Sequence, residues 1–129
     1  MLHLEYFGIR VTNLERSLKF YIELFGLKEV RRGDSSKYGG GRGTWVLLRD
    51  EKSGQQLELN WYPPGSQFSP PYVPGEGLDH IGFLVVNLNE KFRELVAKGV
   101  EVAIRPEETG DWNAYVKDPD GNWIELFKG

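Results

Sequence analysis

The chain contains an internal repeat, because residues 80–88 repeat the pattern of residues 6–14 at a constant offset of 74 (80 − 6). A glycine, a valine, an asparagine and a leucine coincide in the two segments. Further along, the triplet Leu57-Glu58-Leu59 is matched by Ile124-Glu125-Leu126. A repeat of this length predicts two similar supersecondary units that pack together to bury a core.

Each half of the sequence has the pattern of a strand, a helix, a strand, a turn and a strand. Period-two alternation of apolar residues indicates the strands, and apolar residues three and four apart indicate the helices. We expect strands at residues 6–11, 27–31, 44–48 and 56–61, and again at residues 80–86, 100–104, 114–117 and 123–127. We expect helices from Thr12 or Asn13 to Gly26 and from Asn87 or Asn89 to Gly99, because these residue types favour helix starts and stops.

The segment 63–77 is rich in Pro, Gly and Ser, which is typical of a connection between modules. We therefore expect a single α+β domain over residues 1–129, with βαβββ modules at about residues 4–62 and 78–128. Two such modules in tandem predict mixed, curved sheets around a shared cavity, with the helices outside. On the first strand, Phe7, Ile9 and Val11 are expected to face the core.

Composition excludes several classes of function. The chain has 129 residues, no cysteine and a net charge of −3. The lack of cysteine rules out disulfides, thiolate zinc sites and a cysteine nucleophile. The mildly acidic balance argues against nucleic acid or an anionic membrane surface as a partner. The chain shows neither a signal peptide nor an apolar run long enough to span a bilayer, so we expect a cytoplasmic protein.

Four polar residues occupy repeat-related positions near the start and end of each half: Tyr6 and Glu58, then His80 and Glu125. Strand periodicity places each of them opposite the face that packs under a helix. That face could simply meet solvent, but it also carries large apolar and aromatic residues, which make a poor solvent surface. These residues are Trp61, Tyr62, Leu84, Trp123 and Phe127.

A metal centre is the hypothesis that this pattern favours. A single histidine is usually a core residue, and a single strand glutamate usually lies on an exposed face. Three such residues at repeat-related positions, Glu58, His80 and Glu125, are better explained as ligands. Two carboxylates and one imidazole suit one divalent ion, Zn²⁺, Ni²⁺, Co²⁺, Mn²⁺ or Fe²⁺.

The chain resembles the vicinal-oxygen-chelate superfamily, the group of glyoxalase I, bleomycin resistance proteins and extradiol dioxygenases, over essentially its whole length. The segments that carry the resemblance are residues 8–21 with their Phe20-Tyr21 ending, Leu24-Phe25-Gly26-Leu27, residues 78–83, and Asp118-Pro119-Asp120-Gly121 with residues 122–126. The resemblance to glyoxalase I implies metal ligands at Tyr6, Glu58, His80 and Glu125. The first of these is usually His or Gln in the family, so Tyr6 departs from the pattern. His3 has the wrong strand parity to replace it and is expected to be a surface residue.

The resemblance implies a metal-dependent lyase or isomerase that acts on a small substrate with two adjacent oxygens, through a metal-stabilised enediolate. Glu125, or Glu58, would move the carbon-bound proton. An extradiol dioxygenase is an alternative, but it needs more histidines than the two present. A third hypothesis is a binding protein of the bleomycin-resistance type that uses no metal. We expect a homodimer, because such modules leave sheet edges and apolar surface uncovered. The resemblance to glyoxalase I-like dimers implies that Tyr6 and Glu58 face His80 and Glu125 of the partner.

Substrate contacts are expected at Arg10, Asn60 and Trp123. Arg10 and Trp123 stand where glyoxalase I-like enzymes carry the same residue types, the arginine binding a glutathione carboxylate. An asparagine expected four residues after Glu58 is replaced by Tyr62, which puts glutathione itself in question. The glycine-rich run at residues 39–43 opens no helix with a phosphate-binding pattern, so we expect it to be a lid or a plain loop.

Overall fold

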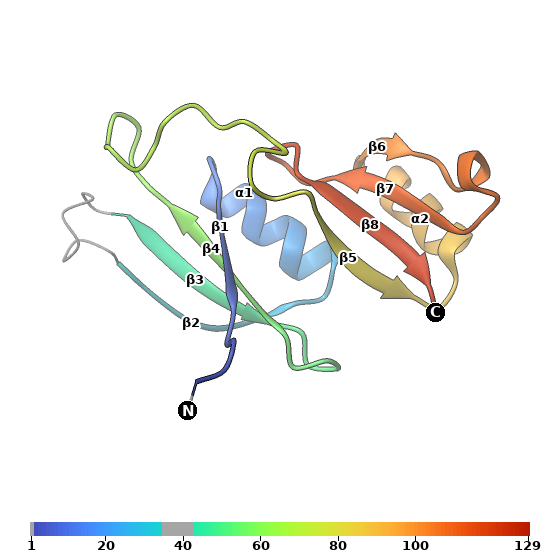
Figure 1. Cartoon of the computed structure of the whole chain (residues 1–129), viewed down its shortest axis with the longest axis horizontal. Helices are drawn as coiled ribbons and strands as arrows, with labels where there is room; N and C mark the ends of the chain where they lie inside the picture. The colour runs from blue at the N-terminus through green and yellow to red at the C-terminus, as the bar shows by residue number, and fades with distance from the viewer. Residues whose placement is uncertain (1, 35–42) are drawn as a thin grey trace. The chain divides into compact units, whose positions relative to one another are not determined.

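The structure is a computed structural model that describes residues 2–34 and 43–129. The chain forms two compact units, Met1–Tyr72 and Val73–Gly129 (Figure 1). Residues 39–42 of the glycine-rich run, predicted as a lid or plain loop, lie outside the described residues. Within the described residues, no helix is long and apolar enough to cross a membrane.

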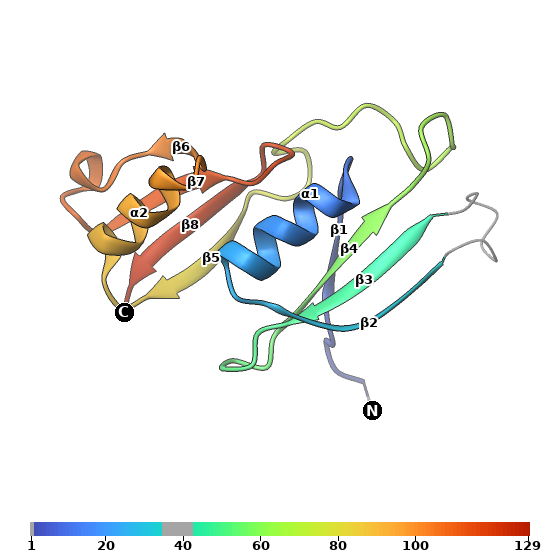
Figure 2. The ribbon, with the colours of Figure 1, turned by 180° about the vertical axis from the view of Figure 1, so that it is seen from behind.

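The first unit contains a four-stranded sheet in the order β1-β4-β3-β2. Strand β1 runs parallel to β4, and the other two pairs are antiparallel. Helix α1 packs against β4 and covers one face of the sheet (Figure 2). The elements are β1 (Phe7–Arg10), α1 (Leu14–Leu18), the π-helical turn η1 (Lys19–Leu24), β2 (Lys28–Asp34), β3 (Thr44–Arg49) and β4 (Gln56–Trp61).

The first helix begins where the sequence predicts. The Asn13 side chain accepts a hydrogen bond from the Arg16 backbone N–H at 3.0 Å and thereby caps the helix. The positive φ of Gly26, 76°, ends it. The second half is a π-helix, however, and periodicity did not indicate that. Beyond it, the Leu27 N–H donates to the Tyr21 carbonyl, six residues back, which closes a cap around Gly26.

The second unit repeats the topology of the first element by element, with the strand order β5-β8-β7-β6. Strand β5 is parallel to β8, and the other pairs are antiparallel. Helix α2 packs on β8 and β7. The elements are β5 (His80–Val85), α2 (Leu88–Ala97), β6 (Glu101–Ile104), a 3-10 helix η3 (Pro106–Thr109) that was not predicted, β7 (Asn113–Lys117) and β8 (Trp123–Lys128). The predicted α+β class and tandem βαβββ architecture are thus confirmed.

Each unit has its own core between sheet and helix. In the first unit the core contains Val11, Leu18, Phe20, Tyr21, Leu27, Val46, Leu48 and Leu59. In the second unit it contains Leu88, Phe92, Leu95, Val100, Ala114, Val116, Ile124 and Leu126. The expectation that Phe7 joins this core was wrong, since Phe7 is 60% exposed. It is the first residue of β1, an edge strand with a neighbour on one side only, so little of the unit covers it.

Candidate functional site

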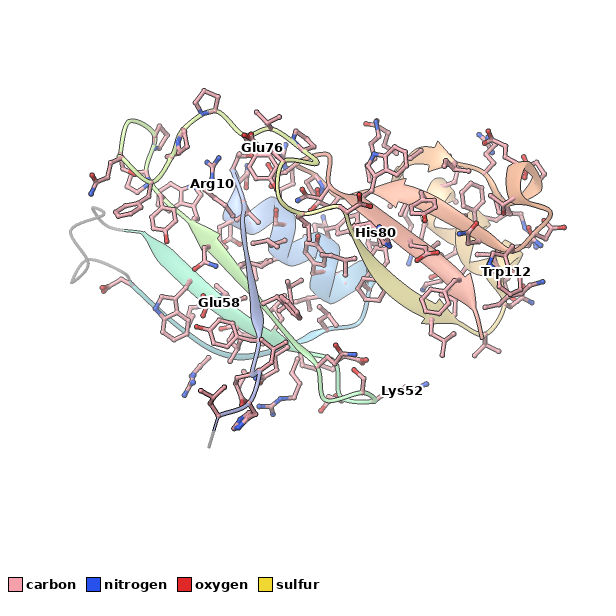
Figure 3. The ribbon with its side chains drawn as sticks, viewed as in Figure 1. Arg10, Lys52, Glu58, Glu76, His80 and Trp112 are labelled. Carbon is pink, nitrogen blue, oxygen red and sulfur yellow. The ribbon has the colours of Figure 1, made fainter. Side chains whose placement is uncertain are left out.

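His80 and Glu125 come together within the second unit. They lie on the neighbouring parallel strands β5 and β8, where Glu125 pairs with Gly82 and is therefore the diagonal neighbour of His80 on one sheet face. His80 Nε2 lies 3.4 Å from Glu125 Oε1. The two side chains are 35% and 20% exposed, so both can be reached from solvent. Figure 3 labels His80 at the start of β5. The structure therefore brings these two repeat-related residues together on one face of the second sheet.

The chemistry of this pair fits a cation. Asp79 Oδ1 lies 2.7 Å from His80 Nδ1, and a carboxylate oxygen can only accept. Nδ1 therefore carries the proton, and in neutral imidazole Nε2 then has a lone pair. Two acceptors, Nε2 and Glu125 Oε1, face each other at 3.4 Å, an arrangement that needs a proton or a metal ion between or beside them. A carboxylate behind the far ring nitrogen is also the usual outer partner of a metal-bound histidine.

Glu58 occupies in the first unit the place that Glu125 has in the second. It pairs with Gly8, as Glu125 pairs with Gly82. A Cβ at Gly8 would lie 3.8 Å from Glu58 Oε1, and a Cβ at Gly82 would lie 3.6 Å from Glu125 Oε1. The glycine that coincides in the two repeats therefore lies beside the glutamate carboxylate in both units, where a Cβ would be in van der Waals contact with it. Its recurrence in the sequence was a signal of this arrangement.

Tyr6 and His3 belong to the segment before β1. Tyr6 is 44% exposed and has the strand parity of Gly8, so it has access to the face that carries Glu58. Its role as a ligand stays a prediction. His3 Nε2 lies 2.6 Å from Glu5 Oε2, and its side chain is 79% exposed. His3 is therefore the surface residue that strand parity predicted.

No group of three or more His, Asp or Glu side chains in residues 2–34 and 43–129 is gathered closely enough to hold a metal ion. Each unit by itself presents two members of the expected set, Tyr6 and Glu58 in the first and His80 and Glu125 in the second. The full ligand set therefore stays a prediction.

The three predicted substrate contacts lie on the same strands as these residues. Arg10 pairs with Asn60 across β1 and β4, and its guanidinium carbon lies 5.1 Å from the centre of the Tyr72 ring. Asn60 Nδ2 donates to the carbonyl oxygens of Ile9 and Glu58, both at 3.4 Å. Asn60 is thus engaged with the backbone of its own sheet.

Tyr115, on β7, is a site residue that the sequence reasoning missed. It pairs with Glu125, and its ring centre lies 5.6 Å from that of His80 and 5.4 Å from that of Trp123. Burial raises the pKa of the Tyr115 phenol, and the negative charges of Glu125 and Asp79 raise it further. The alternation of residues 113–117 was the signal that could have placed Tyr115 on this face.

Comparison with known proteins agrees with the fold. The chain is 31% identical over 132 residues to a lactoylglutathione lyase of Arabidopsis thaliana, a match covering 98% of this chain and 43% of that protein. It is 31% identical over 125 residues to a probable lactoylglutathione lyase of Vibrio parahaemolyticus, covering 93% of this chain and 86% of that protein. The chain spans less than half the length of the plant and yeast relatives it matches, from 35% to 44%.

Among solved structures, the trypanothione-dependent glyoxalase I of Leishmania major superposes with a TM-score of 0.78. That match has 30% sequence identity and covers 98% of this chain and 87% of the other. Residues 3–126 match the model of the Glyoxalase/Bleomycin resistance protein/Dioxygenase superfamily. The repeat, the paired βαβββ units and these matches agree: the chain belongs to the glyoxalase/bleomycin resistance protein/dioxygenase superfamily.

Proposed function

We propose that this chain is a metal-dependent lyase or isomerase of the glyoxalase I type, acting on a small substrate with two adjacent oxygens. The observation that carries the proposal is the facing pair His80 Nε2 and Glu125 Oε1 at 3.4 Å, with Asp79 behind the imidazole. The relatives named lactoylglutathione lyase, at 31% identity, support this class of reaction.

Glu58, His80 and Glu125 would hold one divalent ion, with Tyr6 beside it. Zn²⁺, Ni²⁺, Co²⁺, Mn²⁺ and Fe²⁺ are all suited to this donor set. When bound, such an ion polarises substrate oxygens as a Lewis acid. We further propose a homodimer in which each site combines Tyr6 and Glu58 of one subunit with the second-unit pair of the other.

The carbon-bound proton of the substrate is moved by a glutamate of the site. Glu125 is our choice because its Oε1 already faces the His80 imidazole at 3.4 Å, with Glu58 as the second candidate. Tyr115 and Trp123 contribute aromatic surface beside His80 and Glu125, against which an apolar part of the substrate would pack. Arg10, held over the Tyr72 ring, would bind an anionic group of the substrate.

The test begins with metal-stripped protein to which each of the five ions is returned separately. Loaded protein is then mixed with methylglyoxal and glutathione, and formation of the thioester is followed by its absorbance. Other thiols replace glutathione in parallel reactions, because Tyr62 departs from the glutathione-binding pattern. His80→Ala should abolish turnover.

Turnover by the loaded wild type and not by His80→Ala would support the proposal. If none of the five ions binds or raises the melting temperature, the enzyme proposal fails. A non-catalytic binding protein of the bleomycin-resistance type would then be the better account.

A further inference from the structure

The Asn113 side chain holds the oxygen of Glu125 that does not face His80. Asn113 Nδ2 donates to Glu125 Oε2 at 2.9 Å, whereas Oε1 lies 3.4 Å from His80 Nε2. Asn113 and His80 therefore lie at different oxygens of the carboxylate, and the Tyr115 hydroxyl also hydrogen-bonds to Glu125. A carboxylate with one oxygen tied to an amide loses much of its freedom to rotate, so the other oxygen keeps its direction.

Strand register explains how Asn113 reaches this carboxylate. Tyr115 pairs with Glu125 and Asn113 pairs with Phe127, so Asn113 is the diagonal neighbour of Glu125 on the same sheet face. The diagonal spacing across a ladder is within reach of an asparagine bonded to a longer glutamate side chain. The contact follows from backbone geometry and does not depend on a flexible loop.

The backbone of Asn113 is itself clamped by the 3-10 helix that precedes β7. Its N–H donates to Thr109 Oγ1 at 3.2 Å, and its carbonyl accepts from the same hydroxyl at 2.7 Å. Gly110 and Asp111 adopt positive φ values of 67° and 62°, which turn the chain back between the two residues. An ordered path therefore runs from Thr109 through Asn113 to the Glu125 carboxylate.

The first unit lacks this support at the matching position. Trp45 of β3 stands where Asn113 stands on β7, since each pairs with the residue two after the repeated glutamate. The Trp45 ring instead covers Gly33, where a Cβ would come within 2.7 Å of it. In the part of the chain that the structure describes, no side chain donates a hydrogen bond to the Glu58 carboxylate. The repeat therefore includes the two glutamates but not the side chain that donates a hydrogen bond to Glu125.

We propose that Asn113 is a positioning residue that fixes Glu125 so that Oε1 stays directed at His80 Nε2. The two repeat-related glutamates are then unequal, with Glu125 the oriented one and Glu58 the less restrained one. The use of that oxygen by a metal ion rests on the proposed function, whereas the orientation itself is a property of the metal-free protein. The two parts can therefore be tested separately.

The first test uses metal-free protein and NMR. The side-chain amide of Asn113 is assigned, and its proton and nitrogen shifts are compared in wild type and Glu125→Gln. We expect the proton and nitrogen shifts of the Asn113 amide to change clearly, because the glutamine presents a neutral amide to Asn113 in place of the charged carboxylate. Glu101→Gln, at an exposed residue paired with Lys117, serves as the control and should leave the resonance in place. An Asn113 amide that does not respond to Glu125→Gln overturns the proposal.

The second test uses Co²⁺, whose visible absorption reports ligand geometry. Asn113→Leu keeps a similar size but removes the donor, and we expect at least tenfold weaker Co²⁺ binding and an altered absorption spectrum, as is typical when an outer partner of a ligand is lost. Asn89→Leu, at an exposed position of α2, is the matched control and should resemble wild type. A merely structural role of Asn113 would lower stability without changing the spectrum of the bound ion.

The outcomes separate this inference from the proposed function. Wild type that binds Co²⁺ while Asn113→Leu binds it equally well, with an unchanged spectrum, overturns the role of Asn113 and leaves the proposed function standing. Wild type that binds no ion overturns the proposed function, and the NMR comparison then decides the orientation of Glu125 by itself.

Discussion

Substituting Gly82 by alanine should weaken metal binding at the site while changing the stability of the protein very little. Gly82 is a strand residue without positive φ, so alanine is compatible with its backbone. The added Cβ would lie 3.3 Å from Phe127 Cε1 and 3.6 Å from Glu125 Oε1. The first contact is a few tenths of an ångström tight, and the second places a methyl group directly beside the carboxylate.

Two opposing terms set the expected stability of Gly82→Ala. Replacing glycine in a strand gains about 0.5–1 kcal/mol, because the unfolded chain loses less freedom on folding. The tight contact costs about 1 kcal/mol, at the low end of overpacking, because the edge of the Phe127 ring can shift. The free energy of unfolding should therefore change by less than about 1 kcal/mol.

Metal binding by Gly82→Ala should change much more than its stability. The methyl group occupies the space that Gly82 leaves beside Glu125 Oε1, so we expect about tenfold weaker Co²⁺ binding. Chemical denaturation of the metal-free protein and Co²⁺ titration measure the two quantities. Gly33→Ala is the contrasting control, since its Cβ would come 2.7 Å from Trp45 and should destabilise the protein by about 1–3 kcal/mol.

Either of two results would refute this reasoning. Unchanged Co²⁺ affinity in Gly82→Ala would show that the space beside Glu125 is not used by the site. A loss of stability above about 2 kcal/mol would show that Gly82 serves packing against Phe127.

Three further predictions concern other residues. His80→Ala should lose most bound metal by elemental analysis, whereas His3→Ala should keep it, because only His80 has its second ring nitrogen held by a neighbouring carboxylate in the site. The hydrogen bond from Arg32 lowers the pKa of Glu29 below its ordinary 4.5, so the pair adds stability above that pH and loses it as the pH falls. Since both side chains are partly exposed, Arg32→Gln should cost less than about 1 kcal/mol at pH 7 and progressively less as the pH falls below 4.5, as measured by denaturant unfolding. Because the pKa of Tyr115 is raised, chiefly by burial, its folding contribution is complete below about pH 10 and is lost at higher pH. Tyr115→Phe should therefore unfold with a weaker dependence on pH between about 9 and 11; an unchanged dependence would contradict the shift.

The strands and their faces could be predicted from the sequence because period-two alternation is a local property. The limits of β4, Gln56–Trp61, were predicted to the residue, and β5 alternates in exposure along its length as expected. Strand β2 extends to Asp34, beyond its predicted end at Arg31, because pairing with β3 continues past a bulge. Whether a strand continues depends on its partner, which local alternation does not report.

The support of the site could not be read in the same way, because it depends on register between strands. The sequence positions of Asn113 and Glu125 do not show that their side chains meet, because the contact depends on how β7 pairs with β8. A shift of one residue in that pairing would turn Asn113 to the other face of the sheet. The repeat was informative for Gly8 and Gly82, since each glycine lies beside the repeated glutamate of its own unit. It was misleading for the supporting residues, because a comparison of the two halves draws attention to what they share. Asn113 is informative because the first unit has a different residue, Trp45, at the matching position. In our proposal, this difference is why Glu125 is oriented and Glu58 is less restrained.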